Sequence, residues 1–132
     1  MKRRTLRFVD LFCGIGGFRY AFEQAAESFD VASRCVFSCD IDDACARAYS
    51  ANFGETPAGD IREIDANDIP NHDVLLAGFP CQAFSIIGNG EGFRDTTRGT
   101  LFFDIARILD EKKPRAFVLE NVKGLVSHDK GR

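Results

Sequence analysis

The sequence has few of the residues from which a disulfide-bonded, metal-binding or membrane-spanning protein is built. It contains no Trp, one Met and two His, and its five Cys form no Cys-x-x-Cys pair. The apolar run after the basic start is broken by Arg7 and Asp10, unlike a secretory signal, so we expect reduced thiols in a cytoplasmic protein. His72 and His128 are far apart in the chain, so we expect no metal site. No apolar run approaches the ~18 residues of a membrane helix, which argues against a membrane partner.

A basic excess is also missing. The 132 residues carry 17 Lys and Arg against 20 Asp and Glu, a formal net charge of −3. A small nucleic-acid-binding domain usually has a basic excess. If this chain works on nucleic acid, most of the phosphate-binding surface must lie elsewhere. The 45% of apolar and 28% of charged residues are ordinary for one soluble globular domain.

Apolar segments along the chain alternate between strand and helix patterns. Strands are predicted at residues 6–12, 35–38, 59–61, 73–77 and 116–119, and helices at 18–29, 42–53 and 101–109. Asp42 is expected to cap the second helix, which Gly54 would end, and Pro114 cannot continue the third. Because the strands are continuous apolar runs, we predict an α/β fold with a doubly wound, mostly parallel sheet.

Two segments lie outside this regular pattern. Residues 78–99 are rich in glycine and polar groups, which predicts a long loop. No helix or strand is predicted after the fifth strand, so we expect an uncovered sheet edge on that side. We therefore interpret the chain as incomplete at its C-terminal edge, as a fragment or as one part of a split protein.

Three strand ends carry groups suited to a nucleotide-like ligand. Gly14, Gly16 and Gly17 follow the first strand, where missing Cβ atoms admit a ligand and a helix N-terminus offers free N–H groups. Asp40 ends the second strand, where an acidic residue can hold ribose hydroxyls, and Asp60 follows the third, near an adenine amino group. Together these ends predict an adenosine-containing ligand, although a plain turn and a helix cap are the structural alternatives.

A single cysteine follows the fourth strand. Pro80 fixes the backbone before Cys81, at the strand end where ligands and chemistry collect in such sheets, so a nucleophile and a structural thiol are both open. The cysteines within regular patterns are interpreted as structural thiols: Cys35, Cys39 and Cys45. Glu120 ends the fifth strand, beside the fourth if the sheet runs in order. A carboxylate near a thiol with no nearby His argues against a papain-like hydrolase and suits thiolate attack on a ring that an acid holds.

These motifs together resemble the DNA cytosine-5 methyltransferases, above all the bacterial modification methylases. The resemblance runs from residue 6 to residue 132 and rests on residues 10–18, 59–61, 78–85, 98–103 and 120–122. Its most specific part is Pro80-Cys81-Gln82 followed by Glu120-Asn121-Val122. It implies the Rossmann-like fold of S-adenosylmethionine-dependent methyltransferases and methylation of carbon 5 of a cytosine flipped out of double-stranded DNA.

The resemblance also implies a role for individual residues. Cys81 would add to ring carbon 6 of the cytosine, and Glu120 would hold ring nitrogen 3 and the exocyclic amine. S-adenosylmethionine would bind at Phe12, Gly14, Ile15, Gly16, Gly17, Asp40, Ile41, Asp60, Ile61, Pro80 and Leu101. The DNA substrate would contact Phe79, Gln82, Ser85, Arg98 and Asn121.

The chain departs from the family in three side chains and in what it lacks. The family usually has Glu at Asp40, often an aromatic residue at Ile41, and commonly a small polar residue at Ile87. Its later arginine-containing motif, its target-recognition domain and its final cofactor-lining helix have no counterpart here. We therefore expect residues 1–132 to be the N-terminal part of the catalytic cofactor-binding domain, inactive without the missing C-terminal part or a second subunit.

Three alternatives remain beside this interpretation. The chain could be a non-catalytic S-adenosylmethionine-binding fragment or subunit, or part of a transfer-RNA cytosine-5 methyltransferase, which shares these motifs. The glycine turn alone also allows an NAD-type oxidoreductase, but the loop around Cys81 and the segment at Glu120 need no nicotinamide.

Overall fold

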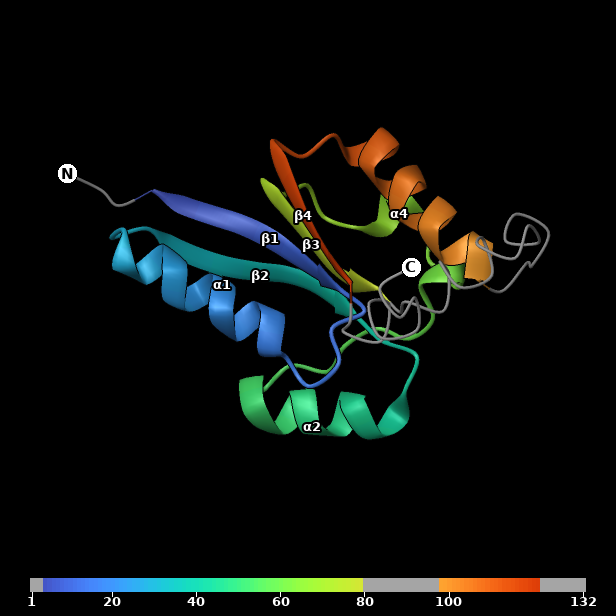
Figure 1. Cartoon of the computed structure of the whole chain (residues 1–132), viewed down its shortest axis with the longest axis horizontal. Coiled ribbons are helices and arrows are strands. Elements are labelled where there is room, and N and C mark those ends of the chain that lie inside the picture. The colour runs from blue at the N-terminus through green and yellow to red at the C-terminus, as the bar shows by residue number, and fades with distance from the viewer. Residues whose placement is uncertain (1–3, 80–97, 122–132) are drawn as a thin grey trace, which may run out of the picture.

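The computed structural model describes residues 4–79 and 98–121 of the chain. In chain order the elements are β1 (Thr5–Leu11), α1 (Gly17–Ser28), β2 (Ala32–Cys39), α2 (Asp43–Phe53), the short 3₁₀ turns η1 (Ile61–Glu63) and η2 (Ala66–Asp68), β3 (Val74–Phe79), α4 (Arg98–Lys112) and β4 (Ala116–Asn121) (Figure 1). None of the helices in the described ranges has the length and apolar character needed to cross a bilayer.

The sheet has four strands in the order β2-β1-β3-β4, and every neighbouring pair is parallel. The chain moves outward from β1 to β2 and then returns to the other side of β1 to form β3. The strand order therefore reverses between β1 and β3. In open parallel sheets, ligands bind outside the carboxyl ends of the strands at such a reversal. The predicted parallel α/β sheet is confirmed.

Helices cover both faces of the sheet, as the doubly wound prediction requires. On one face Phe8 packs against α1, with its ring centroid 4.7 Å from that of Phe22. On the other face Val9 and Leu11 share a core cluster with Ile105 and Ile108 of α4. Figure 1 shows α1 and α4 on opposite sides of the sheet. Alternate side chains of β1 thus enter two separate apolar layers.

The predicted ends of α2 are confirmed. The Cys45 N–H donates to Asp42 Oδ1 at 3.0 Å, which satisfies one of the free donors of the first turn. At the other end Gly54 has a φ of 72°, and its N–H donates to the Ser50 carbonyl at 2.8 Å. A glycine adopts this left-handed conformation without steric cost.

Two predicted segments differ in the structure. Residues 59–61 form no strand, since the segment pairs with the sheet only through the bridge of Ala58 to Cys39. The Asp60 side chain instead accepts from the Arg62 N–H at 2.9 Å and caps η1, a local bond that competes with strand pairing. Strand β2 begins at Ala32, earlier than predicted, because polar residues at its start pair with β1.

The first strand and the first helix each end one residue earlier than predicted. Phe12 has a φ of 55°, so the chain leaves the sheet one residue before the predicted end of the strand. Phe29 is 79% exposed and follows the last residue of α1, so it is not part of the buried helix face. The buried side of α1 instead carries Ala26 and, unexpectedly, Arg19.

Strand β4 is an exposed edge within the described residues. Phe117, Val118 and Leu119 are 53%, 47% and 37% exposed. Successive side chains of a strand point to opposite faces, so both faces of β4 are open where the structure describes them. The prediction that no element covers this edge falls on residues 122–132, which lie outside the described residues. Residues 80–97 of the predicted long loop lie outside the described residues.

Candidate active site

The glycine turn between β1 and α1 leaves room for a ligand. Gly14 and Gly16 have φ values of 55° and 101°, a region that favours glycine. A Cβ atom placed on Gly14 would meet nothing within 4 Å, so this side of the turn is open. The turn leads into the N-terminus of α1, which has no side-chain cap and whose first N–H groups suit a polar or anionic ligand.

The Asp40 carboxylate is part of the same turn. Its Oδ2 accepts from the Gly14 N–H at 2.7 Å, and its Oδ1 accepts from the Asp42 N–H at 2.8 Å. An ionised carboxylate has about four acceptor positions, so each oxygen retains capacity for a ribose hydroxyl. Ile15 follows Gly14 in the sequence and Ile41 follows Asp40, and these two side chains are 59% and 66% exposed. Sequence reasoning placed Asp40 at a ligand but missed that it also fixes the turn.

The Arg62 side chain forms hydrogen bonds and an ion pair with the Asp60 carboxylate. The Arg62 Nη2 lies 2.6 Å from Asp60 Oδ2, and its Nε is 3.0 Å from each Asp60 oxygen. Hydrogen bonding from Arg62 holds the pKa of Asp60 below its usual value. A ligand amine that uses Asp60 must therefore share or displace Arg62. The Asp-x-Arg spacing was visible in the sequence, but its effect on the site was not predicted.

Four predicted site residues from distant segments meet in one apolar cluster. Ile61 and Phe79 are buried in it, and Phe12 and Leu101 pack against it. Arg107 of α4 holds this part of the structure together, because its guanidinium donates to the Ile61 and Ile64 carbonyls at 3.1 and 2.9 Å. The carboxyl ends of β1 and β3 thus share an apolar floor with η1 and α4. Such a floor fits the flat, apolar surfaces of an adenosine group.

Glu120 lies beside the end of β3. It pairs in register with Gly78, and Asn121 pairs with Phe79. The Glu120 Oε1 is 3.3 Å from the position that a Cβ atom on Gly78 would take, so a larger residue there would crowd the carboxylate. This confirms the predicted neighbourhood of the fourth and fifth strands. It also brings an acidic group to the point where the chain leaves β3 toward Cys81.

The family model of C-5 cytosine-specific DNA methylases matches residues 6–132. This chain belongs to the C-5 cytosine-specific DNA methylase family. Enzymes of this family, like their structural neighbours, are S-adenosylmethionine-dependent methyltransferases. The open glycine turn, the free capacity of Asp40 and the apolar floor fit that cofactor.

Individual relatives agree with this assignment. The Type II methyltransferase M.NlaX of Neisseria lactamica is 61% identical over 127 residues, covering 96% of this chain and 39% of the relative. M.HhaI of Haemophilus parahaemolyticus is 54% identical over 126 residues, covering 96% of this chain and 36% of the relative. The Dnmt2 methyltransferase of S. pombe superposes with a TM-score of 0.68 at 26% identity, over 92% of this chain and 38% of that one. The chain thus spans little more than a third of these proteins.

The described cysteines of this methylase chain are poor nucleophiles. Burial raises the pKa of the Cys35 thiol to about 11 and that of Cys39 to about 12. The same cause raises the pKa of Cys13 and of Cys45. The thiolate is the reactive form, so none of the four is activated. The interpretation of these residues as structural thiols holds best for the buried Cys39 and less for the half-buried Cys35 and Cys45.

Several predicted residues of the methylase site lie outside the described part of the chain: Pro80, Cys81, Gln82 and Ser85. The structure describes the backbone of two others, which places Arg98 at the start of α4 and Asn121 at the end of β4. The roles of all six residues stay predictions.

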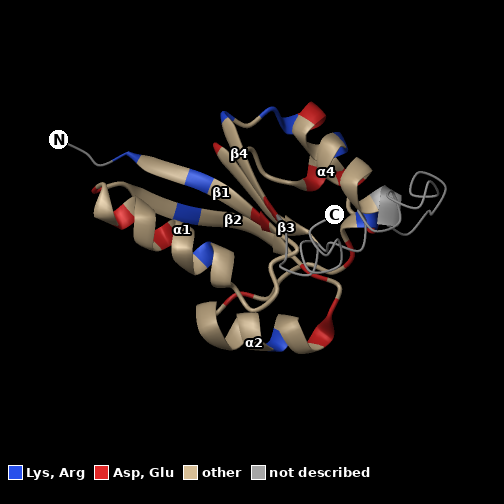
Figure 2. Ribbon diagram, viewed as in Figure 1, with Lys and Arg blue, Asp and Glu red and all other residues tan. Residues whose placement is uncertain are grey.

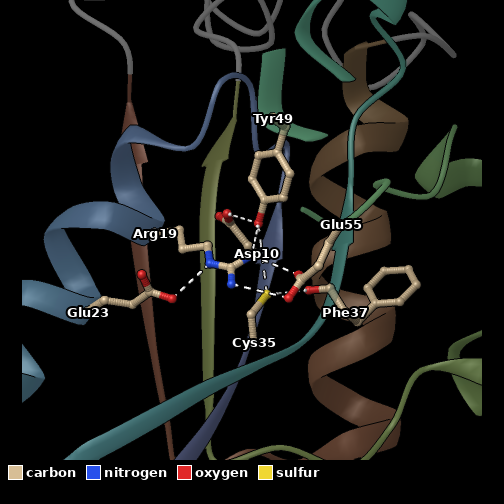
Figure 3. A network of polar contacts seen from close by, with 7 residues as sticks. All are labelled: Asp10, Arg19, Glu23, Cys35, Phe37, Tyr49 and Glu55. Carbon is tan, nitrogen blue, oxygen red and sulfur yellow. Dashed lines mark hydrogen bonds and ion pairs between the residues drawn. The ribbon is translucent and has the colours of Figure 1, made fainter. Parts of the chain in front are cut away.

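A buried polar network behind the glycine turn was not predicted. The Tyr49 hydroxyl donates to Asp10 Oδ2 at 3.1 Å and accepts from Arg19 Nη1 at 3.0 Å (Figure 3). The Arg19 guanidinium also donates to Glu23 at 2.9 Å and to Glu55 at 2.8 Å. The one signal in the sequence was a charged residue beside Phe18 on an apolar helix. Glu23 lies at the helical i+4 spacing from Arg19, but Tyr49 and Glu55 lie too far along the chain for spacing to reveal them.

Proposed function

We propose that this chain is the N-terminal, cofactor-binding part of the catalytic domain of a bacterial DNA cytosine-5 methyltransferase. The observation that carries the proposal is the meeting of three segments at the strand reversal. The glycine turn follows β1, the chain toward Cys81 leaves β3, and Glu120 ends β4 beside Gly78. The Type II names of the relatives support a modification enzyme that acts on double-stranded DNA. Its target-recognition domain lies outside these residues.

S-adenosylmethionine supplies a methyl group that its sulfonium already activates. The turn from Phe12 to Gly17 would hold this cofactor, and Asp40 would accept from its ribose hydroxyls. Asp60 and Ile61 would hold the adenine, and the exposed side chain of Ile41 would pack against it. Pro80 and Leu101 line the methionine side.

Cys81 is the nucleophile in this proposal. Its thiolate forms a bond to carbon 6 of the flipped cytosine, and the electron pair displaced to carbon 5 takes up the methyl group. The proton then leaves carbon 5, and the bond from sulfur to carbon 6 breaks as the aromatic ring is restored. The four described thiols have raised pKa values, which supports Cys81 as the reactive cysteine.

Glu120 stabilises the attacked ring. A carboxyl group can hold ring nitrogen 3 and the exocyclic amine, where charge builds as the thiolate adds. In this proposal the carbonyl of Phe79, the residue after Gly78, also accepts from the amine. Gln82, Ser85, Arg98 and Asn121 contact the DNA around the flipped base.

A substitution of Cys81 tests this function in the complete enzyme. We expect Cys81→Ser to lower turnover by at least ~10³-fold, because a hydroxyl is a far poorer nucleophile at neutral pH. The assay is transfer of a labelled methyl group to duplex DNA, with transfer RNA as a parallel substrate. Cys45→Ser is the matched control and should leave the rate unchanged. Near-normal DNA methylation by Cys81→Ser would exclude the covalent mechanism, and methylation of RNA alone would exclude the DNA substrate.

A further inference from the structure

The last turn of α2 contacts the glycine turn from behind. The Asn52 side-chain amide donates to the Ile15 carbonyl at 3.1 Å. The Phe53 ring lies against Gly16, since a Cβ atom placed on Gly16 would be only 2.1 Å from Phe53 Cε2. Two consecutive residues of α2 therefore fix two consecutive residues of the turn. A side chain on Gly16 would clash with the Phe53 ring, and the φ of 101° at this position also favours glycine.

Phe53 is itself held in place from two sides. The Arg19 guanidinium lies 4.2 Å from the centroid of the Phe53 ring, and the Tyr49 ring centroid is 4.8 Å away. Arg19 is in turn held by Glu55, and Tyr49 is held by Asp10 at the end of β1 (Figure 3). The contacts thus connect β1, α1 and α2 around the turn.

We propose that Asn52 and Phe53 are positioning residues for the cofactor-binding turn, and that Arg19 holds the Phe53 ring in place. They act through Ile15 and Gly16, whose backbone they fix, and they do not touch the reacting atoms. A turn already held in its binding conformation loses less conformational freedom when the cofactor binds. This inference rests on the proposed function, in which the turn binds S-adenosylmethionine.

A positioning role and a merely structural role predict different kinetics. Loss of positioning weakens cofactor binding and raises the KM for S-adenosylmethionine, while kcat at saturating cofactor stays unchanged because the bound turn regains its shape. A structural role would lower the thermal midpoint and the active fraction, and would leave the KM and the Kd of the remaining folded enzyme unchanged. Asn52 is exposed, so its substitution should not unfold the enzyme.

The test uses the complete enzyme with Asn52→Ala, Phe53→Leu and Arg19→Lys, and with Asn67→Ala of η2 as an exposed control. We expect calorimetry to show S-adenosylmethionine bound ~5-fold more weakly by Asn52→Ala, the effect of one lost hydrogen bond. Phe53→Leu should bind at least as weakly, Arg19→Lys more weakly than the unmodified enzyme, and the control normally.

Normal cofactor affinity in both Asn52→Ala and Phe53→Leu would overturn the positioning role, and so would a fall in kcat with an unchanged KM. A failure of the unmodified enzyme to bind S-adenosylmethionine would overturn the proposed function itself, and with it this inference. The two failures are therefore distinguishable.

Discussion

Asp10 is a fully buried acid at the end of the central strand β1. Its Oδ2 accepts from Tyr49, and its Oδ1 has no hydrogen-bond partner among the described residues. Burial raises the pKa of Asp10 from 3.8 to about 7, against the opposing effects of the Tyr49 hydrogen bond and the charge of Arg19. The charges of Glu23 and Asp40 act in the same direction as burial. The proton on Asp10 therefore stabilises the folded protein.

Asp10→Asn should change how stability depends on pH. Between about pH 4 and pH 7 the folded chain holds a proton on Asp10 that the unfolded chain has released, so the contribution of Asp10 is present at low pH and lost as pH rises. The Asn side chain does not titrate, so the stability of the variant does not fall with pH for this reason. We expect its free energy of unfolding, relative to the unmodified protein, to rise by roughly 2–4 kcal/mol over that range. Denaturant unfolding at several pH values measures it, and a constant difference would contradict the raised pKa.

At the residue scale, the sequence predicted which side chains lie at neighbouring strand ends. Asp40 and Glu120 could be predicted because a parallel sheet brings its carboxyl ends together. Arg19 could not, because its partner Glu55 is 36 residues away, and Tyr49 is 39 residues from Asp10. Neither separation follows a helix or strand period. Arg62 was near Asp60, but a turn, not the predicted strand, brings the two side chains together.

Elements with a clear apolar period or a specific cap could be predicted from sequence. The ends of α2 follow from Asp42 and Gly54, and β3 and β4 follow from their continuous apolar runs. The start of β2 was missed because it has no continuous apolar run: Ala32 is followed by the polar Ser33 and Arg34, and β2 is an edge strand. The segment at Asp60 was missed because one side-chain bond to the backbone selected a turn.

The turn η1 allows a test of the adenine side of the site. Asp60→Ala should weaken binding of S-adenosylmethionine by ~1–2 kcal/mol, the scale of one hydrogen bond. Because Arg62 competes for the same carboxylate, Arg62→Ala should bind the cofactor at least as tightly as the unmodified enzyme. Calorimetry on the complete enzyme measures both. Unchanged affinity in Asp60→Ala, or a loss in Arg62→Ala equal to that in Asp60→Ala, would show that the pair only stabilises the turn.

The described part of the molecule is a sheet with an exposed edge strand, β4, and a surface of mixed charge. Red and blue residues are interspersed along α1, α2 and α4 (Figure 2), and the whole chain carries a net charge of −3. Binding of duplex DNA depends on cations that neutralise phosphates. Among the described residues β4 is the last strand of the sheet, so its outer edge and exposed apolar side chains are available to a further strand. In our proposal, the missing part of the enzyme pairs with this edge, completes the cofactor pocket and brings the basic surface.

Methyl transfer by residues 1–132, alone and complemented, tests the central claim most directly. The assay supplies labelled S-adenosylmethionine and mixed-sequence duplex DNA, first with this chain alone and then with a second chain carrying the rest of a relative such as M.NlaX. We expect no methylation by the chain alone and cytosine-specific methylation in the mixture, abolished by Cys81→Ser in this chain. Sequence-specific methylation by the 132 residues alone, or activity of the mixture that survives Cys81→Ser, would contradict the account.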